Sequence, residues 1–312
     1  MNNEISILQL MHTPGLGTRT LSKIISLYNS IETDFRGTLL DYLPEFVEKL
    51  RLQDVLSSVN QSGYESAVQL YDELQKHQIT ILIRGDSAYP RRLSTILGDY
   101  APPVLFARGN SDLLKARTAG FCGSREASET ALTVTENCVS ELIKNNIVIV
   151  SGFARGVDLT AHLRALQDGG NTIFVLPLGI LNFQWKSEIY QFVNDTNSLI
   201  LSEFAPNFGW SAGNAMQRNS TIIGLSDALV LAACSAGGGS FEAGKTCLRL
   251  GQPLFVIDYD KSNTPEGNEY FLRNGAYQIR IDTDNIPNLE QLIKTIRESN
   301  PSSRQKSLFD SD

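Results

Sequence analysis

The stretch Ile147-Val148-Ile149-Val150-Ser151-Gly152-Phe153-Ala154-Arg155-Gly156 joins a short apolar run to a glycine-bearing turn, and an amphipathic segment follows it. A run of Ile and Val has the composition of a strand that is buried on both faces. A turn between such a strand and a helix start leaves backbone N–H groups unpaired, and glycine lets an anion approach them closely. The stretch therefore predicts a strand–turn–helix unit that can bind a phosphate group.

Similar apolar runs recur on both sides of this stretch, with helical segments between them. They lie at 79–83, 102–107, 118–122, 172–176, 198–201, 228–232 and 253–257. The second is entered through Pro102-Pro103, and a short helix or turn is expected to begin at Tyr89. Apolar strands that alternate with helices predict an α/β fold of the extended Rossmann-like type, with a mostly parallel sheet and helices on both faces.

Two more turns carry glycine together with a side chain suited to an anion. They are Gly123-Ser124-Arg125 and Gly237-Gly238-Gly239-Ser240, the latter with Arg218-Asn219 upstream. All three turns follow predicted strands, and ligands of open α/β sheets bind beyond the carboxyl ends of the strands. Several arginine-bearing turns in one domain indicate a ligand with several phosphates, which is a nucleic acid strand or a nucleotide.

Length and charge limit these alternatives. With 312 residues, 42% of them hydrophobic, the chain can bury one large core and a small satellite domain. We expect a helical domain at 1–64, the Rossmann-like domain at 65–298 and a flexible tail at 299–312. The formal net charge of −7 excludes a polycation that coats nucleic acid nonspecifically, so any anion site must be local.

The cysteines and the N-terminus predict the compartment. The four cysteines lie far apart, without the paired spacing of a zinc site or a disulfide framework, so we expect buried thiols in a reducing cytosol, no metal and no cofactor. No basic segment followed by an apolar core opens the chain, and no apolar run reaches membrane-spanning length. The expectation is a soluble, cytoplasmic protein without a membrane contact.

The N-terminal region has a helical pattern, since apolar residues between 4 and about 62 recur every three or four positions. Within it, Thr13-Pro14-Gly15-Leu16-Gly17-Thr18-Arg19 predicts a tight turn between two helices, with Thr18 capping the second. The turn resembles a helix-hairpin-helix, which would place backbone N–H groups and Arg19 or Lys23 against a nucleic acid backbone. An ordinary interhelical corner fits the motif equally well.

An ordered set of segments carries a family resemblance. It comprises Tyr89-Pro90, residues 102–110, Gly123-Ser124-Arg125, residues 151–158 through Ala161-His162, Ser202-Glu203-Phe204, and Arg218-Asn219 through Ser226. In this order the set resembles the DNA-processing protein A family (DprA, also called Smf). The resemblance implies a non-enzymatic protein that binds and protects single-stranded DNA, forms homodimers and loads the recombinase RecA for recombination or DNA uptake.

Under this resemblance the basic side chains Arg125, Arg155, Lys186 and Arg218 contact phosphates, and glycines and hydroxyls supply further donors. The full predicted phosphate-binding set is Gly123, Ser124, Arg125, Ser151, Gly152, Arg155, Gly156, Lys186, Arg218, Asn219, Gly238, Gly239, Ser240 and Lys245. Candidates for base stacking are Phe183, Trp185, Phe208 and Trp210, each of which could instead anchor its loop in the core. For His162 we expect a structural hydrogen bond rather than catalysis.

The last glycine-rich turn departs from the family pattern, because Glu242 stands where the family usually has an uncharged residue. Arg218, Ser226-Asp227-Ala228 and Glu242 resemble the arrangement of LOG-type nucleotide phosphoribohydrolases. The alternative function is therefore a nucleotide sensor or hydrolase, in which Arg218 binds a 5′-phosphate and Glu242 stabilises ribosyl cation character. A simpler interpretation is that Glu242 starts a helix and offsets its dipole.

The C-terminal tail carries a separate motif. Gln305-Lys306-Ser307-Leu308-Phe309 fits the Q-x-x-L-F pattern with which bacterial proteins bind the replicative sliding clamp. In that mode Leu308 and Phe309 enter an apolar pocket and Gln305 makes hydrogen bonds. A chance match explains such a short motif equally well.

Overall fold

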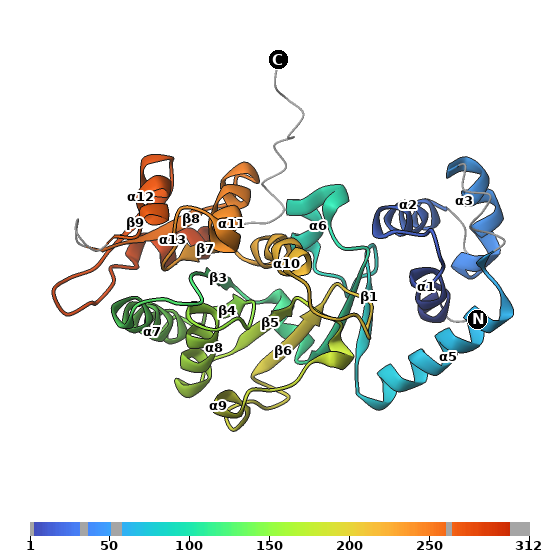
Figure 1. Cartoon of the computed structure of the whole chain (residues 1–312), viewed down its shortest axis with the longest axis horizontal. Helices are drawn as coiled ribbons and strands as arrows, with labels where there is room; N and C mark the ends of the chain where they lie inside the picture. Colours follow the sequence, from blue (N-terminus) through green and yellow to red (C-terminus); the bar gives the residue numbers. More distant parts are fainter. Residues whose placement is uncertain (1–2, 32–36, 51–57, 260–263, 300–312) are drawn as a thin grey trace, which may run out of the picture. The chain divides into compact units, whose positions relative to one another are not determined.

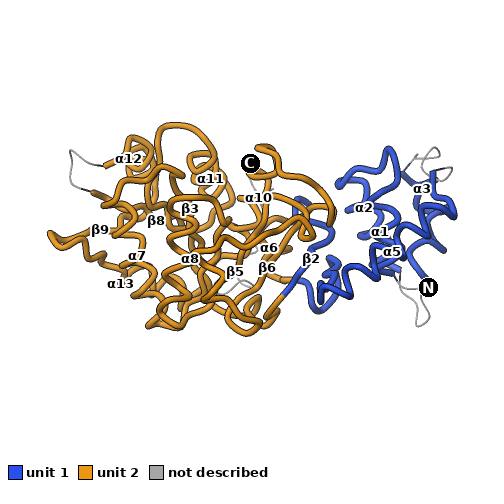
Figure 2. Tube along the Cα trace, turned by 60° about the horizontal axis from the view of Figure 1, so that its bottom comes forward, with its two compact units in different colours: residues 1–89, 99–108 blue, residues 90–98, 109–312 orange. Residues whose placement is uncertain are grey.

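The computed structural model describes residues 3–31, 37–50, 58–259 and 264–299 (Figure 1). The chain divides into two compact units, which Figure 2 shows in different colours. Unit 1 comprises residues 1–89 and 99–108, and unit 2 comprises residues 90–98 and 109–312. Helix α5 (Gln61–Lys76) crosses the expected boundary between residues 64 and 65. The division of the chain into a helical domain at 1–64 and a Rossmann-like domain at 65–298 stays a prediction.

Unit 1 is helical at its N-terminal end and carries one strand pair. Its elements are α1 (Asn3–Met11), α2 (Thr18–Asn29), the 3-10 helix η1 (Leu39–Tyr42), α3 (Leu43–Leu50), α5, and the strands β1 (Thr80–Ile83) and β2 (Val104–Gly109). The two strands are antiparallel, with Ile81 opposite Phe106. Its core is apolar and includes Leu8, Ile24 and Phe46.

The predicted turn between two helices is present at residues 12–17. Gly15 has a φ of 81°, a left-handed conformation that suits glycine. Gly17 is the N-cap of α2 and Thr18 is its first helical residue, so the predicted capping role of Thr18 is wrong. Arg19 and Lys23 point into solvent from α2.

Unit 2 contains a parallel sheet with the strand order β6-β5-β4-β3-β7-β8-β9. The strands are β3 (Thr118–Cys122), β4 (Val148–Ser151), β5 (Thr172–Leu176), β6 (Ser198–Ser202), β7 (Ala228–Leu231), β8 (Leu254–Asp258) and β9 (Tyr277–Arg280). Every pairing between these neighbours is parallel. The sequence predicted all of them except β9, in which only Ile279 is buried and no apolar run exists.

Helices cover both faces of this sheet, as predicted (Figure 1). The helices of unit 2 are α6 (Arg91–Leu97), α7 (Glu129–Lys144), α8 (Val157–Gln167), α9 (Ser187–Tyr190), α10 (Ala212–Leu225), α11 (Gly238–Arg249), α12 (Glu266–Arg273) and α13 (Glu290–Glu298), with short 3-10 turns between some of them. Helices α7, α8 and α13 share one apolar cluster with alternate residues of the strands, such as Phe121 and Val230. Helix α10 contacts α6 and α11.

The strand order places a topological switch beside β3. The chain proceeds from β3 to β4, β5 and β6 in one direction, and β7, β8 and β9 lie on the other side of β3. A crevice forms at such a switch because the loops after the two central strands leave in opposite directions. One of the three predicted turns, Gly123-Ser124-Arg125, directly follows β3.

The prediction that the four cysteines are buried thiols is confirmed, since Cys122, Cys138, Cys234 and Cys247 are all buried and free. Across the part of the chain that the structure describes, no helix combines the length and the apolar character needed to cross a membrane.

Candidate phosphate-binding site at the strand ends

The three predicted turns are joined to one another by hydrogen bonds. The Ser124 amide donates to the carbonyl of Ala233, beyond the end of β7, at 2.8 Å. The Val157 amide at the start of α8 donates to the Ser124 carbonyl at 3.3 Å, and the Ser240 hydroxyl on α11 donates to the Gly123 carbonyl at 2.8 Å. The sequence expectation that these turns lie together at the carboxyl edge of the sheet is thereby confirmed.

The backbone of the turn after β4 allows this close approach. Phe153 and Gly156 have φ values of 61° and 73°, both in the left-handed region. A side chain at Gly156 would overlap the Ser124 carbonyl oxygen, so glycine is required there. Phe153 is not glycine, and its conformation stores strain that the surrounding aromatic contacts must offset.

Two of the predicted cations are exposed at this edge. The side chains of Arg125 and Arg155 are accessible to solvent. The Cζ atom of Arg125 lies 6.0 Å from the centroid of the Trp210 ring, within the range of a cation–π contact. Both guanidinium groups can therefore reach a ligand.

Lys186 is half-buried beside the turn after β4. Its Nζ atom lies 4.7 Å from the Phe153 ring centroid and donates to the Phe153 carbonyl at 3.4 Å. Burial lowers the pKa of Lys186 and Arg155 lowers it further, while Glu188 and Asp158 act in the opposite direction. The contacts with Phe153 therefore hold Lys186 against the turn after β4.

Arg218 is buried, in contrast to the other arginines. It is 4% exposed, and its Nη1 atom lies 3.8 Å from Oδ2 of Asp158. Its Nε and Nη1 atoms have no hydrogen-bond partner. Burial lowers the pKa of Arg218, whereas Asp158 raises it. The guanidinium packs against Gly152, where any side chain would overlap it.

Asp158 supplies an internal anion to the turn after β4. Its Oδ2 atom accepts a hydrogen bond from the Ala154 amide at 3.4 Å. Burial raises the pKa of Asp158, and Arg218 together with the turn amides opposes this shift. Amide groups that could have held a phosphate thus contact a carboxylate of the chain itself.

The predicted donor Ser151 also faces inward. It is buried, and its hydroxyl donates to the Phe121 carbonyl at 2.7 Å. In this conformation Ser151 and Arg218 are buried beneath the candidate site, and Arg125 and Arg155 form its exposed part.

The glycine-rich turn before α11 is open. Gly237 and Gly238 are exposed with φ values of 125° and 78°, and no side chain caps the helix start. Asn219 Nδ2 donates to the Gly239 carbonyl at 3.2 Å, which ties α10 to this turn. Its amide groups remain accessible from solvent.

The residues of the nucleotide-hydrolase alternative all have structural contacts. Glu242 Oε1 accepts from Lys245 Nζ at 3.2 Å, and both side chains are about half exposed. Glu242 is the fifth residue of α11 and not in its first turn, so the interpretation as a helix-start carboxylate is wrong. Asp227 is buried, forms an ion pair with Arg92 and accepts from the Thr118 amide at 2.8 Å.

The structure separates the four aromatic candidates. The Trp185 ring centroid lies 5.2 Å from that of Phe174 and 4.7 Å from that of Phe183, so Phe183 and Trp185 pack with the core. Phe208 and Trp210 are 53% and 56% exposed. Only the second pair presents its rings to solvent.

His162 makes the structural hydrogen bond expected from the sequence. Its Nδ1 lies 2.6 Å from Thr172 Oγ1, whose own proton is donated to the Ile149 carbonyl. The imidazole stacks on Phe174 with 4.0 Å between ring centroids. Burial lowers the pKa of His162 to about 3, so the ring is neutral at physiological pH.

Sequence reasoning assigned no role to Glu203, which lies just after β6. Glu203 is buried and accepts a hydrogen bond from the Thr221 hydroxyl. Burial raises its pKa, while Thr221 and Arg218 lower it. The sequence signal for Glu203 was a carboxyl residue directly after a buried strand.

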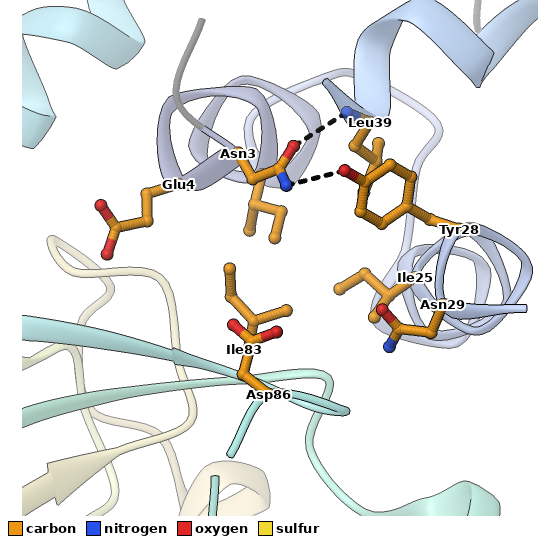
Figure 3. A pocket seen from close by; sticks show the side chains of 9 residues that line it. Asn3, Glu4, Ile25, Tyr28, Asn29, Leu39, Ile83 and Asp86 are labelled. Carbon is orange, nitrogen blue, oxygen red and sulfur yellow. Dashed lines mark hydrogen bonds between the residues drawn. The ribbon is translucent and has the colours of Figure 1, made fainter. Parts of the chain in front are cut away.

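Unit 1 has a cavity of its own, of about 240 Å³, lined by residues of α1, α2, η1 and the end of β1 (Figure 3). Asn3 Nδ2 donates to the Tyr28 hydroxyl at 2.9 Å, and Asn3 Oδ1 accepts from the Leu39 amide at 2.9 Å. Burial raises the pKa of Asp86, and Glu4 raises it further. Two carboxyl groups make this cavity unsuited to a phosphate.

Two sequence predictions concern other parts of the chain. Among the described residues, no group of three or more His, Cys, Asp or Glu side chains could hold a metal ion. The predicted clamp motif with Gln305, Leu308 and Phe309 lies outside the described residues.

A parallel sheet with helices on both faces and with strand-end turns that meet beside a topological switch defines the class of Rossmann-like α/β proteins. Within that class the chain belongs to the family described as DNA recombination-mediator protein A, whose model matches residues 80–290. The resemblance found in the sequence is confirmed.

Individual relatives agree with this assignment. The chain is 31% identical over 208 residues to DNA processing protein DprA of Streptococcus pneumoniae, covering 66% of this chain and 72% of that protein. The X-ray structure of that relative matches with a TM-score of 0.69 at 26% identity, covering 89% of this chain and 94% of the other. Protein Smf of Borreliella burgdorferi is 29% identical over 191 residues, which is 60% of each chain.

A solved structure of DNA processing protein A from Helicobacter pylori, determined for its single-stranded DNA binding mode, matches with a TM-score of 0.58 at 28% identity. The match covers 70% of this chain and 96% of that one. The predicted α/β fold is therefore confirmed by two members of the family.

Proposed function

We propose that the three turns at the carboxyl edge of the unit 2 sheet bind the phosphate backbone of single-stranded DNA. The observation that carries this proposal is the set of hydrogen bonds from Ser124, Val157 and Ser240, which hold the turns together and bring Arg125 and Arg155 to one edge. The Helicobacter pylori relative binds single-stranded DNA. Since the chain has a net charge of −7, binding depends on this local group of cations.

Salt dependence tests the proposal. Each phosphate neutralised on a single strand contributes about 0.7 to the slope of log K against log salt concentration. We expect fluorescence anisotropy with an oligothymidylate to show a salt-dependent affinity, and Arg125→Ala combined with Arg155→Ala to weaken binding and flatten that slope. Arg249→Ala removes another exposed cation, in the last turn of α11, and serves as the control.

Affinity that is insensitive to salt and to both substitutions would contradict the proposal that this surface binds phosphates. An equal loss in Arg249→Ala would indicate general charge effects rather than a site.

We further propose that the protein protects single-stranded DNA and loads RecA on it as a homodimer. The family's description as a recombination mediator supports this step. RecA assembly on single-stranded DNA should proceed faster with the protein present, and Arg125→Ala with Arg155→Ala should abolish the gain. Sedimentation of the protein alone tests the dimer, and a monomer at micromolar concentration would contradict it.

The motif in the tail supports a proposal of its own, tethering to the replicative sliding clamp. Deletion of residues 305–312 should abolish clamp pull-down and leave oligonucleotide affinity unchanged. Leu308→Ala with Phe309→Ala should have the same effect, because these residues would fill the apolar pocket. Unchanged pull-down in both variants would end this proposal.

One observation favours nucleotide handling as a second candidate, namely the buried Nε and Nη1 atoms of Arg218 without a hydrogen-bond partner. The guanidinium is paired with Asp158, but N–H donors without a hydrogen-bond partner are suited to an anionic ligand. Incubation with nucleoside monophosphates, followed by chromatography for free base, tests this candidate. Base release by wild type is compared with base release by Glu242→Gln. Absence of base release by the wild type would end the hydrolase version.

A further inference from the structure

Trp210 combines wide exposure with a fixed backbone. It lies on the segment between β6 and α10 and is 56% exposed, next to Phe208 at 53%. Large aromatic side chains usually bury most of their surface, so two exposed rings in three residues call for a partner.

The backbone that carries these rings is held on both sides. The Gly179 amide donates to the Phe208 carbonyl at 2.8 Å, and the Phe208 amide donates to the Ala205 carbonyl at 2.8 Å. Beyond Trp210, the Ser211 hydroxyl caps α10 by accepting from the Asn214 amide at 3.0 Å. These hydrogen bonds hold the backbone of the segment in one conformation with both rings exposed. Little conformational entropy of the backbone is therefore lost when a ligand stacks on the rings.

A phosphate-binding cation lies beside the exposed ring. Arg125 Cζ is 6.0 Å from the Trp210 ring centroid. Arg125 also belongs to the turn whose Ser124 amide is fixed to Ala233. One nucleotide could thus place its phosphate against the guanidinium of Arg125 and its base against Trp210.

We infer that Trp210 is the stacking platform by which this protein selects unpaired bases over duplex nucleic acid, with Arg125 as its cationic neighbour. The inference rests on the proposed single-strand binding function and names the ring that gives it selectivity. In a duplex the faces of the bases are covered by their neighbours, so only a single strand can offer a base to an exposed ring. Phosphate contacts alone do not provide this distinction, because both forms present them.

The affinity test uses strands with and without bases. We expect Trp210→Ala to weaken oligothymidylate binding by about 5- to 150-fold, the range that corresponds to one stacked base. Trp210→Phe should recover most of that loss. Tyr190→Ala removes another exposed aromatic ring from unit 2 and should have no effect. On an abasic oligonucleotide, wild type and Trp210→Ala should bind equally.

Fluorescence gives a second readout that does not depend on affinity. The chain has two tryptophans, Trp185 and Trp210, so Trp210 is the only source of tryptophan emission in Trp185→Phe. Its emission should be quenched by oligothymidylate and remain unchanged with an abasic strand.

The outcomes separate the inference from the function on which it rests. Salt-dependent binding of oligothymidylate with an unaffected Trp210→Ala variant and unchanged Trp210 emission would overturn the platform and leave the phosphate surface in place. Loss of all salt-dependent binding in the wild type would overturn both.

Discussion

The Arg218 guanidinium approaches the Asp158 carboxylate to 3.8 Å, and both side chains are buried where the turn after β4 meets α10. The contact joins two segments of the family motif that are 60 residues apart in the chain. The carboxylate lies where amide groups of the turn converge, and the guanidinium packs over Gly152. The pair therefore fixes the shape of a turn whose exposed residue, Arg155, is available to a ligand.

Removing the charge of Asp158 should be costly. In Asp158→Asn the buried guanidinium of Arg218 loses its counter-ion, and breaking a buried pair in this way destabilises a protein by about 3–5 kcal/mol. Urea denaturation measures the change in the free energy of unfolding. The control is Asp168→Asn, which breaks a partly exposed pair with Arg164 and should cost less than about 1 kcal/mol. Equal losses in the two variants would contradict a buried ion pair.

A second prediction concerns the space at Gly152. A methyl group there would overlap the Arg218 guanidinium, so Gly152→Ala should destabilise the fold by about 1–3 kcal/mol, as overpacking does. Combining it with Arg218→Ala should recover part of that loss, because the overlapping group is gone. Thermal unfolding of the single and double variants gives the coupling energy.

The control for this prediction lies on the same helix as Arg218. At Gly213 a new methyl group would meet only Ser211 Oγ, at 3.8 Å, so Gly213→Ala should be neutral. If the losses of Gly152→Ala and Arg218→Ala simply add, the two residues do not share the space that the structure assigns to them.

Most of the parallel sheet was predictable because its central strands are continuous apolar runs. Strand β3 matches its predicted bounds, and β4 is shifted by one residue at each end from the predicted run at 147–150, since both strands are buried on each face. Strand β9 escaped prediction for the opposite reason. It lies at the edge of the sheet and buries only Ile279, so its sequence carries no such run.

The location of the candidate site was predictable, but the orientation of its side chains was not. The chain order of strands and turns sufficed to bring Arg125 and Arg155 to one edge. Arg218 turns inward because Asp158 pairs with it and because Gly152 leaves room for its guanidinium group. Both contacts join residues that are distant in the sequence, so no local sequence pattern predicts them. The same holds for the aromatic residues, because only packing against Phe174 separates Trp185 from the exposed Trp210.

The pKa of Glu203 predicts how stability varies with pH. Burial raises this pKa, so the folded state keeps the proton at a pH where the unfolded chain has released it. The stabilising effect of this proton is complete below the ordinary glutamate value of about 4.5 and is lost as the pH rises through the folded-state value. We expect Glu203→Gln to remove this decline, so that its stability relative to wild type grows with pH.

Urea denaturation between pH 4.5 and 7 measures this difference. Glu188→Gln, an exposed carboxyl on α9, should follow the wild-type profile. Parallel profiles for Glu203→Gln and wild type would show that burial does not shift this carboxyl.

His162 predicts a pH dependence of the opposite sign. Its pKa falls from the ordinary value of 6.5 to about 3 because it is buried against Phe174 and Thr172. Below pH 6.5 the unfolded chain therefore binds a proton that the folded chain rejects. Stability is complete above pH 6.5 and declines as the pH falls toward 3, by about 1.4 kcal/mol for each unit.

The substitution His162→Gln keeps a polar group near Thr172 and removes the titration, so the loss between pH 6.5 and 5 should be about 1.6 kcal/mol smaller than in wild type. Urea denaturation at these two pH values measures it, and His77→Gln, at an exposed position after α5, should retain the wild-type loss. If His162→Gln loses as much stability as wild type over this interval, the imidazole takes up its proton in the folded protein and its site is more accessible than the structure indicates.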